Sequence, residues 1–476
     1  MTMSFTNIDD VRRRIEERRN RLNEEQRRAI RSILENPLLE DGFLLPIVDG
    51  PPGTGKTTVG AYACVHGILE GIIRGVLYIA PTNFAAQQAK LAFENLGVAP
   101  GDVVWLNPRA REKNWERGIV GVRWDLSDLG PNDIRRLRNI PIIICTPYML
   151  GRIKRGGFRS SNTKVLIDEF SQVDPAIFFM ILSKTGASVD RYVRGGYALL
   201  GDPLQLPVVT TQEELMENIV EFIRARRTIE GGLNTLTLQY RMHEEICNAV
   251  NRMRQELSPW HDFARLQSSS DIRDRDLEGL GYRYAEERVP QGSCLRREEL
   301  REILNPSYTY VVLNSDRLLG NNREERTRSG SLHNIAEAEV AIDIAVAAHE
   351  SYQAQGEGLA PTIISPYSAQ VYEIRERLRT RHPSYYNILG NRVITAYSSQ
   401  GREYPMVILS LVRNNPWRRI GFLEDEKLRA QLYVACSRAQ AKLVVLMSKN
   451  TFGGRPLYEE LVNTSNSQHA LIWGWD

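Results

Sequence analysis

The 476 residues include 61 Lys and Arg and 58 Asp and Glu, giving a formal charge of +3, and 42% of them are hydrophobic. This composition is ordinary for a globular chain and excludes a disordered tail protein, a collagen and a histone-like basic binder. The sequence contains no run of about 18 apolar residues that could cross a membrane. The charged N-terminus lacks the apolar core of a signal peptide. The five cysteines are scattered and none lies in a C-x-x-C pair, so neither a zinc site nor a disulfide framework is indicated. We expect a reduced, soluble, intracellular protein, cytoplasmic or nuclear, that is monomeric and has no membrane segment.

Short apolar runs rich in β-branched residues alternate with longer helical patterns, which is typical of βαβ units and a mostly parallel sheet. Strands are predicted at 45–49, 76–80, 142–146, 165–168 and 197–200, and then at 235–238, 309–313, 362–365, 392–395, 407–411 and 443–447. Helices are predicted at 56–69, 85–96, 244–253, 336–350 and 369–379. The pattern therefore occurs twice, which predicts two α/β lobes.

The domain boundaries follow from this repeat. We expect an N-terminal helix within 1–22, a first lobe over 23–210, a polar linker over 211–232 and a second lobe over 233–476. Two segments fit neither lobe neatly. Residues 98–140 hold three tryptophans among many charges and are predicted as a small insertion, and residues 254–306 are predicted as an irregular insertion. The roles of both segments stay open.

The sequence GPPGTGKTT lies between the first apolar run and a helical pattern. It matches G-x-x-x-x-G-K-[ST] in the required strand–loop–helix context. Glycines allow backbone N–H groups to surround a phosphate, and the N-terminus of the following helix favours negative charge. Lys56 is expected to reach the β- and γ-phosphates, and Thr57 to ligate Mg²⁺. The predicted nucleotide-binding residues are Gly50, Pro51, Pro52, Gly53, Thr54, Gly55, Lys56, Thr57 and Thr58.

Two carboxylates, Asp168 and Glu169, end a later β-branched run, KVLIDEF. An Asp at this place can hold the Mg²⁺ shell, and a neighbouring Glu can act as the general base that activates water. The same sequence would also fit a strand that ends at an exposed acidic turn. Because the pair follows a phosphate loop on an earlier strand, we interpret the chain as an ATPase with Asp168 as a metal ligand.

A series of further motifs follows in order. They are YALLGDPLQLPVV with Gln205, LTLQYRMHEEI at 236–246, SPYSAQ at 365–370, VITAYSSQGREYPMVILSLVR at 393–413 and LYVACSRAQ at 432–440. Together with LNEEQRRAI at 22–30 and APTNFAAQQ at 80–88, this series closely resembles superfamily 1 helicases, in the branch typified by the up-frameshift helicase of nonsense-mediated decay. The resemblance covers the chain from residue 22 to about residue 447. It implies two tandem RecA-like P-loop NTPase lobes that hydrolyse ATP between them.

The resemblance also implies roles for single residues. Gln26 would read the adenine and Tyr240 would stack on it, while Glu403 would contact the ribose. Gln205 would sense the γ-phosphate. Arg241 and Arg438 would act as arginine fingers, because a planar guanidinium suits a charge spread over several oxygens. Single-stranded nucleic acid, RNA or DNA, would be the partner, with movement 5′→3′ and with protein activators as a further expectation.

Positions that resemble the family's nucleic-acid contacts follow four of the predicted strands. In the first lobe they are Pro81, Thr82, Asn83, Thr146 and Pro147, and in the second lobe Pro366, Tyr367, Thr395 and Ser398. Such loops contact phosphate and sugar without reading bases. Basic residues surround the first set: Arg135, Arg136, Arg138, Arg152, Lys154, Arg155 and Arg159. A backbone-tracking surface is the interpretation favoured over a solvated basic face.

Several positions depart from the family pattern. Phe170 stands where a small Ala is usual, and Tyr397 and Ser399 replace an Asp and an aromatic residue. Only 25 residues precede Gln26, where this branch commonly carries a small barrel on a stalk. We therefore expect weak or partner-dependent unwinding. An ATP-gated clamp or ribonucleoprotein remodeller with little unwinding remains the alternative, while a degenerate scaffold or a small-molecule kinase would not need the complete set of motifs.

Overall fold

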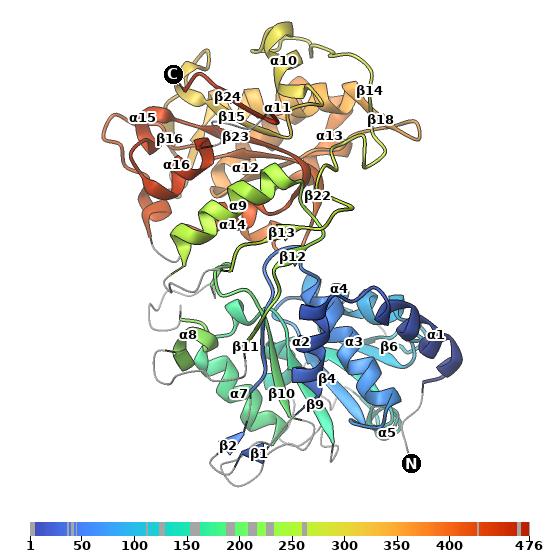
Figure 1. The fold of residues 1–476 in the computed structure, drawn as a ribbon. Helices are drawn as coiled ribbons and strands as arrows, with labels where there is room; N and C mark the ends of the chain where they lie inside the picture. Colours follow the sequence, from blue (N-terminus) through green and yellow to red (C-terminus); the bar gives the residue numbers. More distant parts are fainter. Residues whose placement is uncertain are drawn as a thin grey trace. The chain divides into compact units, whose positions relative to one another are not determined.

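The computed structural model describes residues 5–35, 38–39, 42–43, 45–110, 113–122, 129–152, 162–186, 196–207, 217–224, 233–258, 264–425, 428–463 and 468–475 (Figure 1). The chain forms two compact units. Unit 1 comprises Met1–Pro203 and Pro207–Thr237, and unit 2 comprises Leu204–Leu206 and Leu238–Asp476. No helix in the described part of the chain is long and apolar enough to span a membrane.

The sheet of unit 1 has nine strands in the order β11-β3-β10-β9-β4-β8-β5-β7-β6. Every neighbouring pair is parallel except β6 and β7. The strands are β3 (Ile47–Asp49), β4 (Gly75–Ile79), β5 (Val103–Asn107), β6 (Lys113–Asn114), β7 (Ile119–Gly121), β8 (Ile142–Cys145), β9 (Thr163–Ile167), β10 (Tyr197–Gly201) and β11 (Leu233–Thr235). A separate short hairpin pairs β1 (Leu38–Leu39) with β2 (Gly42–Phe43).

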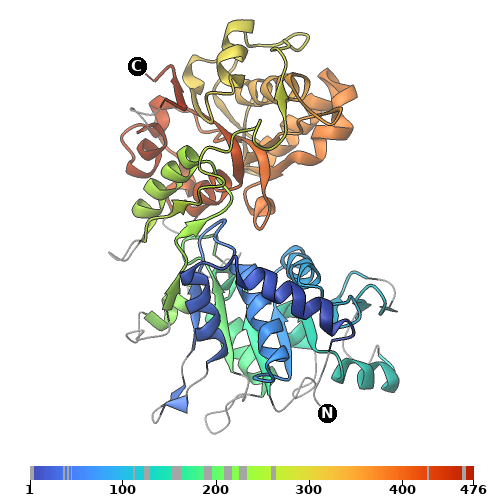
Figure 2. The same cartoon turned by 45° about the vertical axis from the view of Figure 1, so that its right-hand side comes forward.

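Helices cover both faces of this sheet because its strands are apolar on both sides. Val76 and Tyr78 of β4 pack with α1 (Ile8–Arg19), α2 (Glu24–Leu34), α3 (Lys56–Leu69) and α4 (Asn83–Asn95). Leu77 and Ile79 point to the other face, where they pack with α5 (Pro131–Arg138), α6 (Pro147–Arg152), α7 (Pro175–Thr185) and α8 (Ile219–Arg224). The dark blue helix α1 contacts α3 (Figure 2).

Two features of unit 1 differ from the sequence-based expectations. Residues 98–140 are not a separate insertion, because β5, β7 and β6 extend the main sheet beyond β8. The strand expected at 235–238 is divided: β11 pairs with β3 in unit 1, whereas β12 (Leu238–Gln239) pairs with β13 (Gln267–Ser268) in unit 2. The boundary between the units therefore follows Thr237 rather than residue 232, because Leu236 is buried in the core of unit 1.

The sheet of unit 2 is wholly parallel, with the order β21-β20-β22-β23-β15-β24. Its strands are β15 (Tyr310–Asn314), β20 (Thr362–Ser365), β21 (Val393–Thr395), β22 (Tyr404–Ser410), β23 (Ala439–Met447) and β24 (Ala470–Trp473). The edge strand β24 has only four residues and was not predicted from the sequence. With the sheet of unit 1, this arrangement confirms the predicted α/β class of parallel-sheet lobes.

Two helical layers enclose the second sheet. One layer contains α9 (Glu244–Leu257), α14 (Ala430–Cys436), α15 (Lys449–Phe452) and α16 (Pro456–Val462). The other contains α10 (Arg297–Leu304), α11 (Ile335–Ser351), α12 (Ser368–Arg381) and α13 (Pro383–Leu389). The segment expected as an insertion at 254–306 contributes the end of α9, β13, β14 (Arg283–Tyr284) and α10; β14 joins β18 (Tyr352–Ala354) and β19 (Glu357–Gly358) in a small sheet.

A buried carboxyl group fixes the chain where it leaves β22. Glu337, in the first turn of α11, accepts hydrogen bonds through Oε2 from Ser410 Oγ (2.7 Å) and from the backbone N–H of Val412 (2.8 Å). Val412 has φ of +70°, a costly conformation for a β-branched residue. Asn334 Nδ2 donates to the carbonyl of Val412 at 3.2 Å. Glu337 and Asn334 together stabilise this strained turn.

Replacing Glu337 with Gln should flatten the dependence of stability on pH. Burial raises the pKa of Glu337 to about 7 from a usual 4.5, so between these values the folded protein holds a proton that the unfolded chain has lost. The stabilising contribution is complete below the unfolded pKa, and it falls by about 3 kcal/mol as pH rises from there through the folded pKa. Urea unfolding of both proteins across this range measures it. An equal slope in the variant would contradict the assignment to Glu337.

Candidate active site

The phosphate loop connects β3 to α3 and adopts a conformation that requires glycine. Gly53 and Gly55 have φ of +81° and +82°, in the left-handed region. A Cβ at Gly50 would lie 2.7 Å from the Cβ of Lys56, so a side chain there would displace the lysine stem. Thr54 Oγ1 donates to the carbonyl of Pro51 at 2.8 Å and closes the loop on itself. The loop is therefore shaped before any nucleotide binds.

The functional groups of unit 1 meet at the carboxyl edge of its sheet. Thr57 Oγ1 and the hydroxyl of Tyr78 donate to Asp168 Oδ2 at 3.2 and 2.6 Å. Lys56 Nζ lies 3.3 Å from Glu169 Oε1. Glu169 has φ of +50°, and among the described residues its buried Oε2 has no hydrogen-bond partner. The geometry thus brings four of the predicted catalytic or metal-binding residues together and leaves one carboxylate oxygen available.

The electrostatics of this site fit a divalent cation. Burial and the charge of Glu169 raise the pKa of Asp168 to about 6, although the Lys56 ammonium and the Tyr78 hydroxyl lower it. A cation beside Thr57 and Asp168 would lower this pKa again and so offset the effects of burial and of the Glu169 charge. One hydroxyl and one carboxylate are hard oxygen donors, and Mg²⁺ is commonly held by one or two protein groups with phosphate and water completing its shell. These residues therefore fit Mg²⁺.

Phe170, which departs from the family pattern, has a structural explanation. Its side chain is fully buried in the core beneath the sheet. A Cβ at Gly201, where β10 ends, would lie 2.6 Å from the Phe170 ring. The missing side chain at Gly201 therefore makes room for the larger residue after Glu169. The two positions pack as a pair, and the position of the general-base candidate is preserved.

Gln26 connects α2 with the phosphate loop. Its backbone N–H donates to Asn23 Oδ1 at 2.8 Å, and its Oε1 accepts from the Asn23 backbone at 3.2 Å, a capping box that starts the helix. Its Nε2 also donates to the carbonyl of Thr54 at 3.2 Å. The side chain is buried. Gln26 is therefore held directly beside the loop, as an adenine-reading residue would need to be.

The two predicted arginine fingers lie together in unit 2. Arg241 Nη2 forms an ion pair with Glu403 Oε1 at 2.7 Å, and its Nη1 donates to the carbonyl of Ser437 at 3.0 Å. Arg438 donates to the carbonyls of Val434 and Arg402 and to Ser437 Oγ. Ser437 is thus shared by both guanidinium groups. Glu403, expected at the ribose, lies against Arg241 in this structure.

Gln205 and Tyr240, two further residues expected to contact the nucleotide, both belong to unit 2. Gln205 is in the short segment Leu204–Leu206 that belongs to unit 2, although the sequence suggested the first lobe. Its Oε1 lies 3.5 Å from Gln400 Nε2. Tyr240 is half-buried and directly precedes Arg241.

The predicted nucleic-acid residues of unit 1 follow adjacent strands. Ile79 of β4 is in register with Cys145 of β8, which places the following loops side by side. Thr82 is exposed and caps α4 through the N–H of Ala85 at 3.1 Å. Thr146 accepts from the N–H of Met149 and is buried, as is Pro147, while Pro81 and Asn83 are half-buried. Of the basic residues, Lys154, Arg155 and Arg159 lie outside the described residues.

The corresponding set in unit 2 also occupies one sheet edge. Ser365 of β20 is in register with Thr395 of β21, so half-buried Pro366 lies close to Ser398, whose Oγ is 2.9 Å from Thr395 Oγ1. Tyr367 is buried, and its ring packs on Phe422 with 4.9 Å between centroids. Tyr367 therefore supports the loop with its ring, and the exposed Ser398 is the more accessible member of the set.

Two family models, both described as an AAA domain, match residues 21–276 and 212–450. Each covers more than half of the chain, and together they span both units. The chain belongs to the AAA-domain family, as a superfamily 1 helicase of the up-frameshift type. The predicted family is confirmed.

Among the relatives of this helicase is an Arabidopsis thaliana protein named regulator of nonsense transcripts 1 homolog, 25% identical over 95% of this chain and 34% of that protein. The human RNA helicase Mov10l1 is 27% identical over 93% of this chain and 35% of that protein. The chain thus spans about a third of the length of these relatives. A solved arterivirus nonstructural protein 10 helicase matches 91% of this chain and 63% of that chain, with 14% identity and a TM-score of 0.42, a likeness that carries no argument on function.

Two residues of the helicase that position its arginines were missed by the sequence reasoning. Gln239 Oε1 accepts from the backbone N–H groups of Arg241 and Met242, both at 2.8 Å, and Ser437 contacts both guanidinium groups. Both residues are completely buried. Each directly flanks a motif arginine or tyrosine, but no local pattern distinguishes a buried amide or hydroxyl from an exposed one.

Proposed function

We propose that this chain is an ATP- and Mg²⁺-dependent motor that moves 5′→3′ along single-stranded nucleic acid and separates duplexes. The observation that carries the proposal is the meeting of Lys56, Asp168 and Glu169 at the phosphate loop of unit 1. Unit 2 contributes the paired arginines. The named relatives, a nonsense-transcript regulator and an RNA helicase, support the same assignment.

Each residue of unit 1 has a separate task in hydrolysis. The Lys56 ammonium would leave Glu169 for the β- and γ-phosphates, since a triphosphate carries more negative charge than one carboxylate. Glu169 is then free to accept the proton of the attacking water. Thr57 and Asp168 would hold Mg²⁺, which neutralises charge on the phosphate oxygens. Asp168 is kept in place by the Tyr78 hydroxyl.

The arginines of unit 2 would stabilise the charge that develops on the γ-phosphoryl group. Their guanidinium groups are oriented by contacts with Glu403, Ser437 and the backbone, so little conformational entropy is lost when they bind a phosphate. Neither unit has the complete set of catalytic groups. Turnover should therefore require both, and the nucleic-acid loops that follow the strands of each unit would respond to the nucleotide state.

The test is ATP hydrolysis by the purified chain with matched RNA and DNA homopolymers at a stated salt concentration, because backbone binding weakens steeply with salt. The proposal expects Mg²⁺-dependent turnover that single strands stimulate. Hydrolysis indifferent to every nucleic acid would refute it. Stimulated hydrolysis without strand displacement on a 5′-tailed duplex would favour the ATP-gated clamp, the alternative that the replaced residues Tyr397 and Ser399 suggest.

Replacing Gln26 with Ala should weaken selection for adenine more than it slows chemistry. The amide can donate to and accept from a base edge, and its present contact with Thr54 shows that it reaches the loop. KM for ATP should rise about tenfold, the cost of a lost polar contact, while kcat changes little. Steady-state kinetics with ATP and GTP measure the selectivity. The matched control is Asn23→Ala, which removes the same capping box without removing the amide of Gln26.

A further inference from the structure

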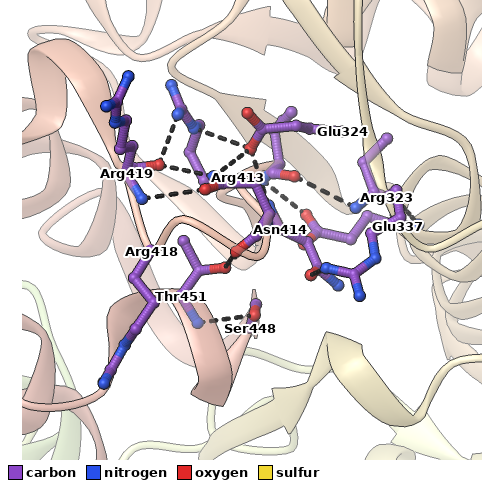
Figure 3. A network of polar contacts seen from close by, with 12 residues as sticks. Arg323, Glu324, Glu337, Arg413, Asn414, Arg418, Arg419, Ser448 and Thr451 are labelled. Atoms are coloured by element: carbon purple, nitrogen blue, oxygen red, sulfur yellow. Dashed lines mark hydrogen bonds and ion pairs between the residues drawn. The ribbon is translucent and has the colours of Figure 1, made fainter.

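One carboxylate of unit 2 organises the loop that follows β22. Glu324, on β16 (Glu324–Arg326), accepts through Oε2 from the backbone N–H of Asn414 at 3.0 Å and from Asn415 Nδ2 at 2.9 Å. The same oxygen lies 2.9 Å from Nε of Arg413 (Figure 3). Three consecutive residues are thus tied to a single oxygen atom. The start of the loop cannot move without breaking all three contacts.

The remainder of the loop is closed by hydrogen bonds of its own. Asn415 donates through Nδ2 to the carbonyl of Arg419 at 2.7 Å and accepts through Oδ1 from its N–H at 3.0 Å. The Asn415 N–H donates to Thr451 Oγ1 at 3.0 Å. Arg418, with φ of +55°, donates to the carbonyl of Gly453 at 2.7 Å. Residues 413–419, which we call the Trp417 loop, are therefore held in one conformation before any partner binds.

The tip of this rigid loop exposes an indole. Trp417 is 74% exposed, and Pro416, Arg418 and Arg419 beside it are exposed too. Trp is among the residues that contribute most when an interface forms, because its ring offers a large apolar face together with a polar N–H group. The contacts that hold the loop remove the ordering cost that a flexible loop would pay on binding.

The Trp417 loop and the hairpin that contacts it are rich in arginine. The β16–β17 hairpin (β17, Leu332–Asn334) contacts the Trp417 loop through Glu324 and through Arg323, whose Nη1 donates to Asn414 Oδ1 at 3.4 Å. Residues 323–328 and 413–419 contain six arginines and two glutamates. Glu324 is occupied within the network, and Glu325 lies 3.6 Å from Nε2 of His333. The exposed arginines are Arg323, Arg326, Arg328, Arg418 and Arg419.

This surface adjoins the predicted nucleic-acid loops of unit 2. Strand β22 is the parallel neighbour of β20, so the Trp417 loop leaves the same sheet edge as Pro366. The hairpin reaches that edge as well: Ser331 Oγ accepts from the N–H of Ala369 at 3.1 Å. The loop and the hairpin thus continue the edge at which Thr395 and Ser398 lie.

We propose that Trp417 stacks on a base of the bound single strand while the arginines of the β16–β17 hairpin and of the Trp417 loop contact its phosphates. This extends the proposed function, on which it rests, by adding a contact outside the motifs of the family. A basic surface with an aromatic residue is the combination by which proteins bind single strands without reading their sequence. The positive charge argues for a polyanion and against a neutral protein surface.

The test measures binding of the full chain to a fluorescently labelled homopolymer of uridine or thymidine by anisotropy. Trp417→Ala should raise Kd about tenfold, as expected for the loss of one stacked base. Trp417→Phe should retain most of the affinity, and Trp417→Leu, equally apolar but without an aromatic face, should resemble Trp417→Ala. The wild-type chain should bind an oligonucleotide with abasic positions as weakly as the Trp417→Ala protein binds the intact oligonucleotide. The Trp417→Ala protein should lose no further affinity for the abasic oligonucleotide.

The arginines are tested by salt dependence. Each of Arg326→Ala and Arg328→Ala should reduce the slope of log Kd against log salt by about 0.7 if the arginine contacts one phosphate. Arg379→Ala is the matched control, because Arg379 is paired with Glu376 at the far end of α12 and should leave the slope unchanged. ATP hydrolysis without nucleic acid should be the same in all these variants.

The outcomes separate this inference from the function on which it rests. A wild-type chain that binds no single strand refutes the proposed function. If the wild-type chain binds and the Trp417→Ala and Trp417→Leu proteins bind with the wild-type affinity, the role of Trp417 is refuted and the proposed function stands. The stacking contact would also be overturned if Trp417→Phe and Trp417→Ala lost affinity equally, provided that thermal melting shows both variants to be folded.

Discussion

Replacing Glu169 with Gln should lower kcat for ATP hydrolysis by about a hundred- to ten-thousand-fold while nucleotide binding is retained. The carboxylate lies 3.3 Å from the Lys56 ammonium, and its Oε2 is buried without a partner among the described residues. An amide of the same size fills the space but cannot accept a proton from water. Single-turnover hydrolysis gives the rate, and titration with a fluorescent ATP analogue gives the affinity.

Lys56→Ala provides the contrast for this measurement. Removing the ammonium should weaken both binding and hydrolysis, because Lys56 contacts the phosphates in the ground state as well as in the transition state. Asp174→Asn serves as the control for a neighbouring buried carboxylate, since Asp174 caps α7 through Ile177 and lies outside the catalytic groups. A Glu169→Gln protein that hydrolyses ATP at nearly the wild-type rate would exclude Glu169 as the general base.

The second large effect is expected at the arginines of unit 2. Arg438→Ala should lower kcat about a thousandfold or more, as arginine fingers do in other P-loop enzymes. Arg241→Lys should also be impaired, because a point charge does not reproduce the planar fork that contacts both Glu403 and Ser437. Hydrolysis and nucleotide affinity are measured separately, and the loss should fall mainly on kcat.

Stability must be measured alongside, because Arg438 is almost completely buried and donates to two backbone carbonyls and one hydroxyl. Removing it leaves acceptors without partners, at a cost of about 1–3 kcal/mol each. Lys442→Met is the matched control: Lys442 is equally buried in unit 2, its Nζ donates to the carbonyl of Asn305, and it lies outside the arginine cluster. A destabilised Lys442→Met protein should keep its kcat per folded molecule. An equal loss of kcat in the two variants would make the effect of Arg438 merely structural.

Much of each unit could be predicted from local sequence. The helix after the phosphate loop begins and ends at the expected residues, because a helix-compatible apolar sequence follows a loop that only its glycines permit. The expected strands of unit 1 lie within a few residues of β3, β4, β8, β9 and β10, since buried parallel strands are short apolar runs. The two carboxylates at the end of β9 were recognisable for the same reason.

Other features depended on which segments meet in space. Nothing near Phe170 indicates that Gly201 makes room for its ring, and nothing near Glu324 indicates that it holds three residues of a distant loop. Trp417 was not predicted to have a role, because the sequence alone does not show whether a tryptophan is exposed or buried. The division of the run at 235–238 between two sheets was equally hidden, since β-propensity does not specify a pairing partner.

The sequence by itself determined the phosphate loop, the paired carboxylates and the order of the motifs, because each of these depends on residues adjacent in the chain. Only the tertiary structure decided that Ser437 links Arg241 to Arg438, that Glu337 holds the strained turn at Val412 and that the loop exposing Trp417 is fixed by an arginine-bearing hairpin. Those contacts join residues that are far apart in sequence. They form because a parallel sheet gathers the starts of its strands at one edge and their ends at the other: Ser437 and Arg438 lie just before β23, whereas Val412 and the Trp417 loop follow β22.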